Sequence, residues 1–538
     1  MAHDYAAVLQ PLTRHINTRD LLLLSRGFSE TYRDLAQQSS QHFLATPVTA
    51  LPTGRETGTF LAIDVGGTNL RVAFVKLLGE AGEQNGDSNS TSRHHVPDRP
   101  TKIHRCHERA WPIEEHLKMD QADDLFMWIG DCIAAVVRDA LGDASLHIDH
   151  LDEIPMGITF SFPMKQDAIS QATLMPMGKG FGITSDLDLG KMLLAGYARH
   201  CAKAPTSNGY AHLQKPAPPS LPKLRIAAIT NDTVATYASL AYSIKVSSNS
   251  RVVMGLVVGT GTNATVPMTV DSLGSFKTHF LRLPAGTSPQ NAKVVVNTEW
   301  SVCGTDRPLK ELQVPTIWDA ELDRACDAPG FQPIEYMTAG RYLGELVRLV
   351  LVQLLPEQCG GSKEDLPPAL LRRNSLSTKF LATVVALADD EELGRSLQEL
   401  YPTRSAGFTW TKNRMELLRA VAAAVQVRSA ALVAAMIVGL LARAGEIHQD
   451  NLETDQNENA IPEKPEAEKE REQLLVVAHT GGVILQYPGY LEDCEKWIDT
   501  LLSAGSQKNT SKKVVLGEAK DGGVIGAAVL AGMFAETR

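Results

Sequence analysis

The sequence predicts an α/β protein built from two related lobes, and three observations support that class. The chain has 538 residues, of which 43% are hydrophobic and 21% charged, as is typical of a soluble globular enzyme. A strand, a Gly-Thr turn and a second strand occur twice, and mixed helix and strand patterns follow each copy. At about 150 residues per domain the length allows two to four domains. The repeat favours two lobes on a common plan, with a cleft between them.

The repeated motif occupies residues 60–77 and 252–268, and each copy is an apolar strand, a glycine turn and another apolar strand. The tripeptide Gly-Thr-Asn recurs at 67–69 and at 261–263, an offset of 194 residues. Internal similarity of this kind is typical of domains built on one plan. Apolar residues at helical spacing predict helices over 337–355 and 415–444.

Three polar segments look like insertions into this plan rather than parts of its core. They are residues 83–105, 203–223 and 450–472, each rich in Pro, Gly, Asn or charged residues. Such segments cannot bury enough apolar surface to offset their ordering entropy.

Charge, cysteine content and hydropathy exclude several partners. Lys plus Arg number 52 and Asp plus Glu 62, a net charge of −10 that is spread along the chain, so neither nucleic acid nor an anionic membrane is an expected partner. The 7 cysteines are scattered with no C-x-x-C pair, which argues against a disulfide framework or zinc site and favours a reducing compartment. The N-terminus does not resemble a signal peptide, and we expect a cytoplasmic protein. The longest apolar run, 429–442, is too short to span a bilayer and predicts a buried helix.

The first glycine turn has the composition of a phosphate-binding hairpin. Glycines let backbone N–H groups approach an anion, the Thr hydroxyl adds a donor, and Asp64 offers a carboxylate to a metal-bound water. A plain tight turn between strands is the alternative, and the matching turn at 259–262 counts against it. The chain has neither a Walker loop nor a turn that opens a helix as a dinucleotide fingerprint does.

Asp232 follows the apolar strand 225–229, beside Asn231 and Thr233. A carboxylate at a strand end, next to an amide and a hydroxyl, suits a general base that deprotonates an alcohol for attack on phosphorus. The alternative is an aspartate that caps a helix beginning at Thr233.

Polar groups at further strand and turn ends form the inventory that sugar recognition needs, since carboxylates and amides bind vicinal hydroxyls. Each could also be a cap, a surface charge or a turn residue. Glu345 is the hardest to dismiss, because it lies in an apolar helix and an unpaired buried carboxylate is costly. These groups lie in segments 159–163, 178–181, 297–300 and 344–346.

Glycine-rich stretches near the C-terminus, 478–482 and 517–528, could line a flat slot for a purine ring. Close packing of a helix on a sheet is the alternative explanation for the same small residues.

Taken together, these motifs resemble the hexokinase family of the actin-like ATPase superfamily, from about residue 20 to 532. The matching passages are LAIDVGGTNLRV, ITFSFP, NDTVAT, GLVVGTGTNA, VNTEWS, YLGELVR and DGGVIGAA. The resemblance implies a two-lobed, ribonuclease H-like α/β fold. Its expected parts are an N-terminal helical segment on the large domain (1–54), a small domain (55–231), a large domain (232–515) and a C-terminal helix returning to the small domain (516–538).

The resemblance also implies roles for individual residues. Asp232 is similar to the base that takes the proton of the sugar 6-hydroxyl, and Lys179 to the cation that neutralises the transferred phosphoryl group. The sugar would be bound by Ser161, Phe162, Pro163, Asn231, Asn263, Glu299 and Glu345. ATP would be bound by Asp64, Gly66, Gly67, Thr68, Asn69, Arg71, Gly259, Thr260, Gly261, Gly481 and Gly482. Mg²⁺ would be held by Asp64 through a water, with no direct protein ligand identified.

Departures from the family pattern bear on the substrate. Gly178 stands where the family has a threonine, so a hydroxyl that touches the sugar is missing and the pocket is roomier. The stretch 174–181 resembles fungal hexokinase-like proteins that phosphorylate N-acetylglucosamine, which favours that sugar slightly over glucose. His479-Thr480-Gly481 replaces the family's Val-Asp-Gly near the adenine.

The expected function is an ATP- and Mg²⁺-dependent hexose or N-acetylhexosamine 6-kinase, acting as a monomer or homodimer on a sugar and a nucleotide. A catalytically weak sugar sensor of the same fold is the alternative. A force-generating or chaperone ATPase of the superfamily is disfavoured, because Glu299 and Glu345 would then have no role.

Overall fold

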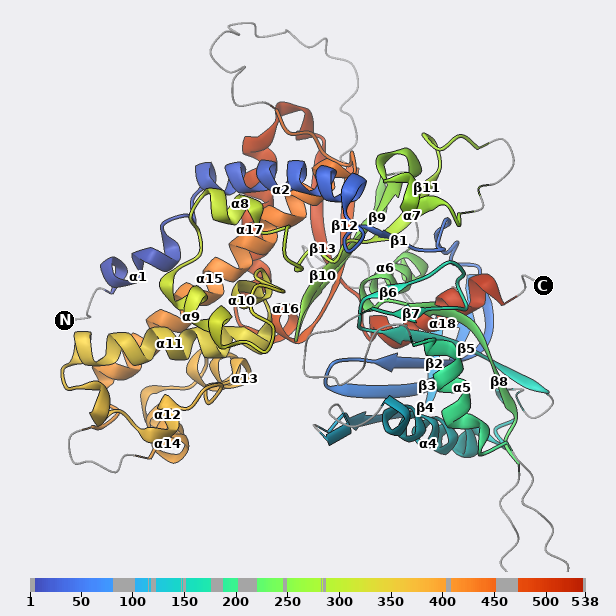
Figure 1. The fold of residues 1–538 in the computed structure, drawn as a ribbon, viewed down its shortest axis with the longest axis horizontal. Helices are drawn as coiled ribbons and strands as arrows, with labels where there is room; N and C mark the ends of the chain where they lie inside the picture. The colour runs from blue at the N-terminus through green and yellow to red at the C-terminus, as the bar shows by residue number, and fades with distance from the viewer. Residues whose placement is uncertain are drawn as a thin grey trace, which may run out of the picture. The chain divides into compact units, whose positions relative to one another are not determined.

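The computed structural model describes residues 5–80, 102–114, 116–117, 122–146, 148, 151–175, 187–201, 220–244, 249–281, 283, 287–402, 408–450 and 473–535. The chain forms two compact units (Figure 1). Unit 1 comprises Met1–Leu44, Ser247–Ser275 and Thr298–Glu518. Unit 2 comprises Ala45–Val246, Phe276–Asn297 and Ala519–Arg538.

Within the described residues, unit 2 contains a five-stranded sheet in the order β4-β3-β2-β5-β8. Strand β3 is antiparallel to both β2 and β4, whereas β2, β5 and β8 run parallel to one another. Because parallel strands end at the same edge of a sheet, the carboxyl ends of β2, β5 and β8 lie together. The strands are β2 (Thr57–Val65), β3 (Asn69–Leu78), β4 (Ile103–Pro112), β5 (Glu153–Phe160) and β8 (Lys223–Thr230).

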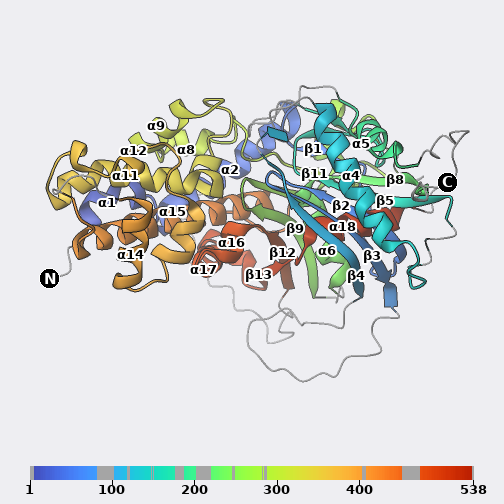
Figure 2. The same cartoon turned by 90° about the horizontal axis from the view of Figure 1, so that it is seen from below.

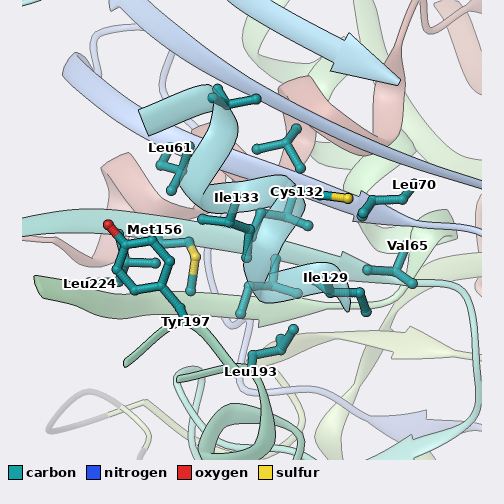
Figure 3. Close-up of a cluster of buried hydrophobic side chains, with 14 of the residues drawn as sticks. Leu61, Val65, Leu70, Ile129, Cys132, Ile133, Met156, Leu193, Tyr197 and Leu224 are labelled. Carbon is teal, nitrogen blue, oxygen red and sulfur yellow. The ribbon is translucent and has the colours of Figure 1, made fainter. Parts of the chain in front are cut away.

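One face of this sheet is covered by α4 (Ala122–Ala140) and α5 (Leu189–Ala198). Alternate residues of β2 and β3, such as Leu61 and Leu70, pack there against Ile129 and Ile133 of α4 (Figure 3). All four side chains are fully buried. The alternation of apolar residues that marks these strands in the sequence thus builds the core of unit 2.

The other face of the sheet is covered by α18 (Gly522–Phe534), which contacts β2, β3, β5 and β8 and packs along α6 (Asp232–Ser243) (Figure 2). The approach is very close. A methyl group at Gly157 would overlap the carbonyl oxygen of Ala527, and one at Gly526 would overlap that of Ala235. Only small residues allow two backbones to lie this near one another.

The remaining strands of unit 2 are short. Strands β6 (Met164–Lys165) and β7 (Thr173–Leu174) pair with each other. Strand β11 (Lys293–Asn297) neighbours β1 (Leu44–Ala45), at which the boundary between the units falls. Thr46 donates its N–H to Val295 O at 3.0 Å, and Val295 donates to Val48 O at 2.9 Å.

Unit 1 repeats the plan of unit 2. Strands β9 (Ser250–Val258) and β10 (Thr262–Thr269) form an antiparallel hairpin, and β12 (Gln473–Thr480) and β13 (Lys512–Glu518) continue the sheet as parallel strands. The order β10-β9-β12-β13 matches β3-β2-β5-β8 of unit 2. The internal repeat predicted from the Gly-Thr-Asn turns is therefore confirmed.

Helix α15 (Lys412–Arg443) is the central helix of unit 1 and contacts α2 (Thr18–Gln38), α11 (Gly340–Cys359) and α17 (Tyr490–Gly505). Its length and composition would allow it to cross a membrane, but most of it is buried inside the unit, as expected for the apolar run 429–442. Arg428 forms a buried bidentate ion pair with Asp319, with N–O distances of 2.9 and 2.7 Å. Burial alone would raise the pKa of Asp319, but the charge and hydrogen bonds of Arg428 bring that pKa below its usual value.

The described helices of unit 1 are α15, the helices that contact it and several further helices. They are α1 (Ala6–Thr13), α2 (Thr18–Gln38), α8 (Arg307–Glu311), α9 (Ile317–Ala325), α10 (Glu335–Thr338), α11 (Gly340–Cys359), α12 (Pro368–Leu371), α13 (Thr378–Phe380), α14 (Asp390–Leu400), α15 (Lys412–Arg443), α16 (Gly482–Gln486) and α17 (Tyr490–Gly505). Single-turn segments lie at Val270–Ser272, Lys363–Asp365, Leu381–Val385 and Gln507–Asn509, and α7 (Ser275–Thr278) lies at the unit boundary.

Several predicted boundaries differ from those of the structure. The small domain was expected to end at residue 231, but unit 2 also includes 45–54, 232–246 and 276–297, because α6 packs on α18. Residues 103–105 belong to β4 and residue 223 to β8, so the insertions expected at 83–105 and 203–223 end earlier. Most of those segments, and residues 451–472, lie outside the described residues.

We expect the substitution Gly526→Ala to destabilise unit 2, because the added methyl group forces α6 and α18 apart. Overpacking of this kind costs about 1–3 kcal/mol, measured as the free energy of urea unfolding by circular dichroism. Gly394→Ala in α14 is the control: its methyl group would lie 3.6 Å from the flexible Met415 side chain, so a gain of up to about 1 kcal/mol is expected. Equal stability of the two variants would contradict the packing argument.

Candidate functional site

The turn between β2 and β3 carries the first set of predicted residues. Gly66 donates its N–H to the carbonyl oxygen of Asn69 at 2.9 Å, which closes the turn. Thr68 is exposed and accepts the Ile113 N–H on its carbonyl oxygen at 2.8 Å. The Asn69 side chain donates to the Thr68 hydroxyl at 3.2 Å. The turn is therefore held by its own backbone and by the segment after β4, and it presents a hydroxyl and an amide to solvent.

Polar side chains gather where the parallel strands of unit 2 end. Asp64 of β2 is the register partner of Thr159 of β5, which is paired in turn with Thr230 of β8. Asp232 follows two residues later as the first residue of α6. Hence Asp64, Thr159 and Asp232 all lie at the carboxyl edge of the sheet, the position at which α/β proteins bind ligands.

Helix α6 is capped by Asn231, not by Asp232. The Asn231 side chain accepts the Thr233 N–H at 2.9 Å and the Thr233 hydroxyl at 2.8 Å, and Asn231 is itself buried. The side-chain oxygen is thus engaged as an N-cap, and the sugar-binding role of Asn231 stays a prediction that would use its amide N–H groups. The Thr233 N–H also donates to Asp232 at 2.8 Å, which orients the carboxylate of the predicted base.

Asp64 is electrostatically unusual. Its carboxyl group lies against Gly523 at the start of α18, where an added side chain would overlap it. Withdrawal from water and then the negative charge of Asp232 raise the pKa of Asp64 to about 7, with Asp521 adding to the rise and Arg71 opposing it. A carboxyl group that titrates near neutral pH at the edge of a sheet is a common feature of functional sites.

The residues that follow β5 make backbone hydrogen bonds and also contribute a side chain to the core. Ser161 donates its N–H to Val65 at 3.0 Å, which ties the segment to the end of β2. Phe162 is buried in the core of unit 2 beside Phe160, with ring centroids 4.7 Å apart, so its side chain does not offer an aromatic wall to a sugar. Pro163 accepts the Met175 N–H at 3.0 Å. Lys179, together with Gly178, lies outside the described residues.

In unit 1 the second turn is enclosed by other glycines. Gly340, the first residue of α11, donates its N–H to Gly259 O at 2.7 Å, and Arg341 donates to Thr260 O at 3.3 Å. Gly481 follows β12 with φ of 119° and approaches Val258 so closely that a side chain there would overlap its carbonyl group. Gly482 begins α16. The structure thus brings the predicted nucleotide residues 259–261 and 481–482 together.

His479 belongs to the interior of this sheet. It lies in β12 and is 1% exposed, and burial lowers its pKa to about 4. An uncharged, buried imidazole does not offer adenine a surface to pack on. Of the residues predicted to line the adenine slot here, the glycines that follow His479 therefore remain.

Asn263 and Glu299 are brought close to one another at the start of β10. The Thr298 hydroxyl donates to the Asn263 side chain at 3.4 Å and to Ala264 O at 2.9 Å. Glu299 is buried and has φ of 47°. A non-glycine residue in the left-handed region stores strain of about 1–3 kcal/mol, and such residues cluster at functional sites.

Glu335 of α10 is a polar residue of this region that sequence reasoning missed. It is 1% exposed, and its carboxylate accepts the Thr262 N–H at 3.2 Å and the Ser301 hydroxyl at 3.4 Å. It therefore links the residue before Asn263 to the segment after Glu299. The available signal was a carboxylate in an otherwise apolar stretch, the same signal that singled out Glu345.

Glu345 is buried in α11, as its apolar surroundings predict, and it is paired. Arg348 contacts it bidentately at 2.6 and 2.7 Å, and the Asn374 N–H donates to it at 2.6 Å. The side chains of Glu345 and Arg348 are only 6% and 8% exposed. Among the described residues, three of the roughly four hydrogen bonds that a carboxylate can accept are thus made to Glu345 by the protein.

These features define a class of protein. Each unit carries a hairpin whose turn is made of glycine and threonine, followed by parallel strands whose carboxyl ends hold polar side chains. Unit 2 adds two neighbouring carboxylates and unit 1 a buried, strained glutamate. The set is that of an α/β phosphotransferase, in which turns bind phosphate groups and a carboxylate activates an alcohol.

Comparison with known proteins gives the family. A hexokinase family model matches residues 253–533, and a second hexokinase model matches residues 9–242. A hexokinase of Oryza sativa subsp. japonica is 27% identical over 93% of this chain and 83% of its own length. A hexokinase of Emericella nidulans is 27% identical over 91% of this chain and 82% of its own length. The structure of a Schistosoma mansoni hexokinase complexed with glucose matches with a TM-score of 0.70, 25% identity and 98% coverage of both chains.

The chain belongs to the hexokinase family. It has the two-lobed actin-like fold, and it is a kinase that transfers a phosphoryl group to a sugar hydroxyl.

The raised pKa of Asp64 predicts a pH dependence of stability. Between about pH 4 and pH 7 the folded protein binds a proton that the unfolded chain releases, so this carboxyl group lowers stability as pH rises through that window. Asp64→Asn should therefore raise the melting temperature at pH 8 and leave it unchanged at pH 4, measured by calorimetry.

Asp143→Asn is the control of opposite sign. Hydrogen bonds from Ser145 and then His107 lower the pKa of Asp143 to about 2, so its removal should lower the melting temperature at pH 8. An Asp64→Asn variant less stable than the wild type at pH 8 would contradict the assignment.

Proposed function

We propose that this kinase uses ATP with Mg²⁺ to phosphorylate the 6-hydroxyl group of a hexose, and that Asp232 is the general base. The observation that carries the proposal is the position of Asp232. It begins α6 directly after the carboxyl end of β8, and its charge acts on Asp64 at the end of β2. A base within reach of the phosphate-binding edge of the sheet is what attack by an alcohol on phosphorus requires.

The different surroundings of Asp64 and Asp232 suit these two carboxyl groups to different roles. Two neighbouring carboxyl groups disfavour simultaneous ionisation, and it is Asp64 whose pKa is raised to about 7. Asp232 is half-buried and receives the Thr233 N–H. This supports Asp232 as the group that accepts the proton of the sugar hydroxyl and Asp64 as the group that responds to a cation.

The described residues fit a nucleotide and Mg²⁺. The lack of a side chain at Gly523 lets the Asp64 carboxylate lie against the start of α18, and a carboxylate with waters is the kind of site that Mg²⁺ takes. When bound, Mg²⁺ would neutralise charge on the phosphate groups. In unit 2 the phosphate contacts would come from the turn 66–69 and Arg71, and in unit 1 from the turn 259–261 and from 481–482.

The sugar would be held by Asn263, Glu299 and Glu345 of unit 1. A strained, buried Glu299 supports this, because it follows Thr298, whose hydroxyl donates to the Asn263 side chain. Carboxylates and amides together accept from and donate to vicinal hydroxyl groups. The bidentate pair with Arg348 orients the Glu345 carboxylate, which supports Glu345 as an acceptor of a hydroxyl group. Glucose-type hexoses are the primary candidates, because the relatives are named hexokinases.

N-acetylglucosamine is a second candidate acceptor. Its support is the sequence at 178, where glycine replaces the family's threonine and removes a side chain next to the sugar. A roomier pocket would admit the N-acetyl group at C2.

Asp232→Asn should lower kcat by at least about 100-fold, the range of general base catalysis, while sugar binding measured by calorimetry persists. Asp188→Asn is the matched control: Asp188 also precedes a helix of unit 2, accepts the Lys191 N–H at 3.0 Å and is half-buried, so turnover should stay within about twofold. Near-normal turnover of Asp232→Asn would remove Asp232 as the base. Sugar binding without turnover by the wild type would point to a sugar sensor instead.

An ADP-release assay with glucose, mannose, fructose and N-acetylglucosamine should rank the acceptors by kcat/KM. We expect turnover of glucose, and we expect Gly178→Thr to reduce the kcat/KM ratio of N-acetylglucosamine to glucose. A ratio that Gly178→Thr leaves unchanged would rule out residue 178 as the determinant.

A further inference from the structure

Asp521, which immediately precedes α18, makes two ion pairs that no motif predicts. Its carboxylate lies 3.4 Å from Nη1 of Arg71 and 2.7 Å from Nη1 of Arg105. Arg71 belongs to β3 and Arg105 to β4, whereas Asp521 is more than 400 residues away in sequence. All three side chains retain access to solvent, with exposed fractions of 42%, 34% and 30% for Arg71, Arg105 and Asp521.

The backbone at Asp521 is in the left-handed region, with φ of 48° and ψ of 37°. A non-glycine residue in that region is uncommon, although Asp tolerates it better than most. An aspartate before a helix usually accepts a hydrogen bond from the first turn, yet the Asp521 side chain makes no such bond. Its carboxylate is directed to the arginines instead, so helix capping does not account for this conformation.

A β-bulge places Arg105 where Asp521 can reach it. The β3–β4 register shifts between the pairs Val72↔Arg109 and Phe74↔Cys106, and His107 has φ of 50° at that point. The extra residue in β4 pairs Arg105 with Val75. Since residues an even number apart share a face of a strand, Val75 and therefore Arg105 lie on the same face as Arg71.

Without the bulge Arg105 would lie on the opposite face of the sheet. Continuing the register of Arg71↔Ala110 and Val72↔Arg109 without a shift would pair Arg105 with Lys76. The Lys76 side chain faces the other side, where it donates to Ser145 O at 3.3 Å. A bulge that redirects a side chain next to a site is a recurring use of this irregularity.

The arginine pair lies next to the predicted phosphate turn. Arg71 is the register partner of Asp64 on the face covered by α18, and the charges of Arg71 and Asp521 both act on Asp64. Arg105 has a second partner in Glu108, at 3.0 Å. The carboxylates of Asp521 and Glu108 balance the two guanidinium groups, so the cluster would offer oriented N–H donors beside the turn 66–69 rather than an excess of positive charge.

We propose that Asp521 is a positioning residue that holds Arg71 and Arg105 side by side, and that Arg105 is a second cation for the phosphate groups of the nucleotide. This inference rests on the proposed use of ATP. Guanidinium groups suit the task because their planar N–H donors match phosphate oxygens, and a donor already held in place loses less side-chain entropy on binding.

Removing the charge of Asp521 should change the KM for ATP in opposite directions under the two possible explanations. Coulomb's law alone predicts that removing the Asp521 charge strengthens binding of an anionic nucleotide. Positioning predicts the opposite. Asp521→Asn keeps a residue that tolerates positive φ, and it should raise the KM for ATP by roughly fivefold to tenfold, with the KM for the sugar unchanged. An unchanged or lowered KM for ATP would overturn the proposal.

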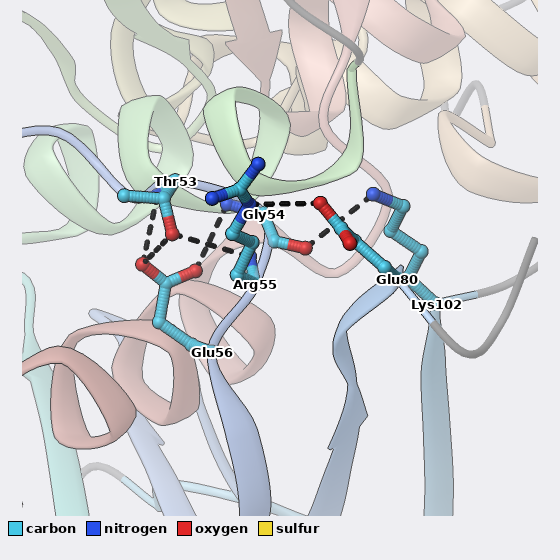
Figure 4. A network of polar contacts seen from close by, with 6 residues as sticks. All are labelled: Thr53, Gly54, Arg55, Glu56, Glu80 and Lys102. Atoms are coloured by element: carbon cyan, nitrogen blue, oxygen red, sulfur yellow. Dashed lines mark hydrogen bonds and ion pairs between the residues drawn. The ribbon is translucent and has the colours of Figure 1, made fainter.

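A matched control is available in the same unit. Arg55 and Glu80 form an exposed pair at 2.8 Å near the other end of the β2–β3 hairpin (Figure 4). Glu80→Gln makes the same carboxylate-to-amide change and should leave both KM values within twofold, since exposed pairs contribute little. A rise in the KM for ATP in this variant equal to that in Asp521→Asn would show a general charge effect and would also overturn the proposal.

Arg105→Gln separates the roles of the two arginines and protects against misfolding of the Asp521 variant. It should raise the KM for ATP as Asp521→Asn does. In the double variant the KM for ATP should rise by less than the product of the two single increases, because both substitutions disrupt the same interaction between Asp521 and Arg105. Multiplicative effects, or a normal KM for ATP in Arg105→Gln, would contradict the inference. A wild type without ATP-dependent turnover would instead refute the proposed function itself.

Discussion

The rest of unit 2 depends on one steric constraint, the close approach of α18 to the sheet and to α6. Gly157, Gly526 and Gly523 occupy points at which any side chain would overlap a backbone carbonyl group or the Asp64 carboxylate. Because these positions are glycine, the start of α18 lies at the carboxyl edge of β2 and β5, where the Thr159 hydroxyl donates to Gly523 O at 2.8 Å. The position of the helix in turn fixes Asp521 next to Arg71. The packing of α18 therefore also sets where the charged side chains of unit 2 lie.

Attraction of an anionic nucleotide depends on groups at the site rather than on the overall charge of the chain. The chain carries a net charge of −10, so its overall field does not attract an anionic nucleotide. Attraction has to come from backbone N–H groups, from arginines held by carboxylates and from a bound cation. In unit 1 the corresponding devices are a turn enclosed by Gly340 and Gly481, and a buried Glu345 whose charge Arg348 balances.

Much of the fold and part of the candidate site could be predicted from local patterns in the sequence. Each hairpin is specified by apolar alternation on both sides of a glycine turn, and Asp232 by its place after an apolar strand, so these were predictable. The pairing of Asp521 with Arg71 and Arg105 was not, because it joins distant parts of the chain and depends on a bulge at His107 that no local pattern marks. Phe162 is ambiguous in the sequence because an aromatic residue next to a strand end can pack in a core as readily as against a sugar, and its side chain is buried in the core of unit 2. Asn231 is ambiguous in the same way, because N-caps and sugar ligands use the same side chains, and its side-chain oxygen caps α6.

The central claim is that the chain transfers the γ-phosphoryl group of ATP to the 6-hydroxyl group of a hexose, and ³¹P NMR of the wild-type reaction with ATP, Mg²⁺ and glucose tests it most directly. The 6-hydroxyl is borne by a carbon with two hydrogens, so the account predicts a new phosphate monoester signal split into a triplet, with ADP formed in equal amount. A doublet would place the phosphate on a ring carbon with one hydrogen. A doublet, or release of inorganic phosphate without a sugar ester, would contradict the account.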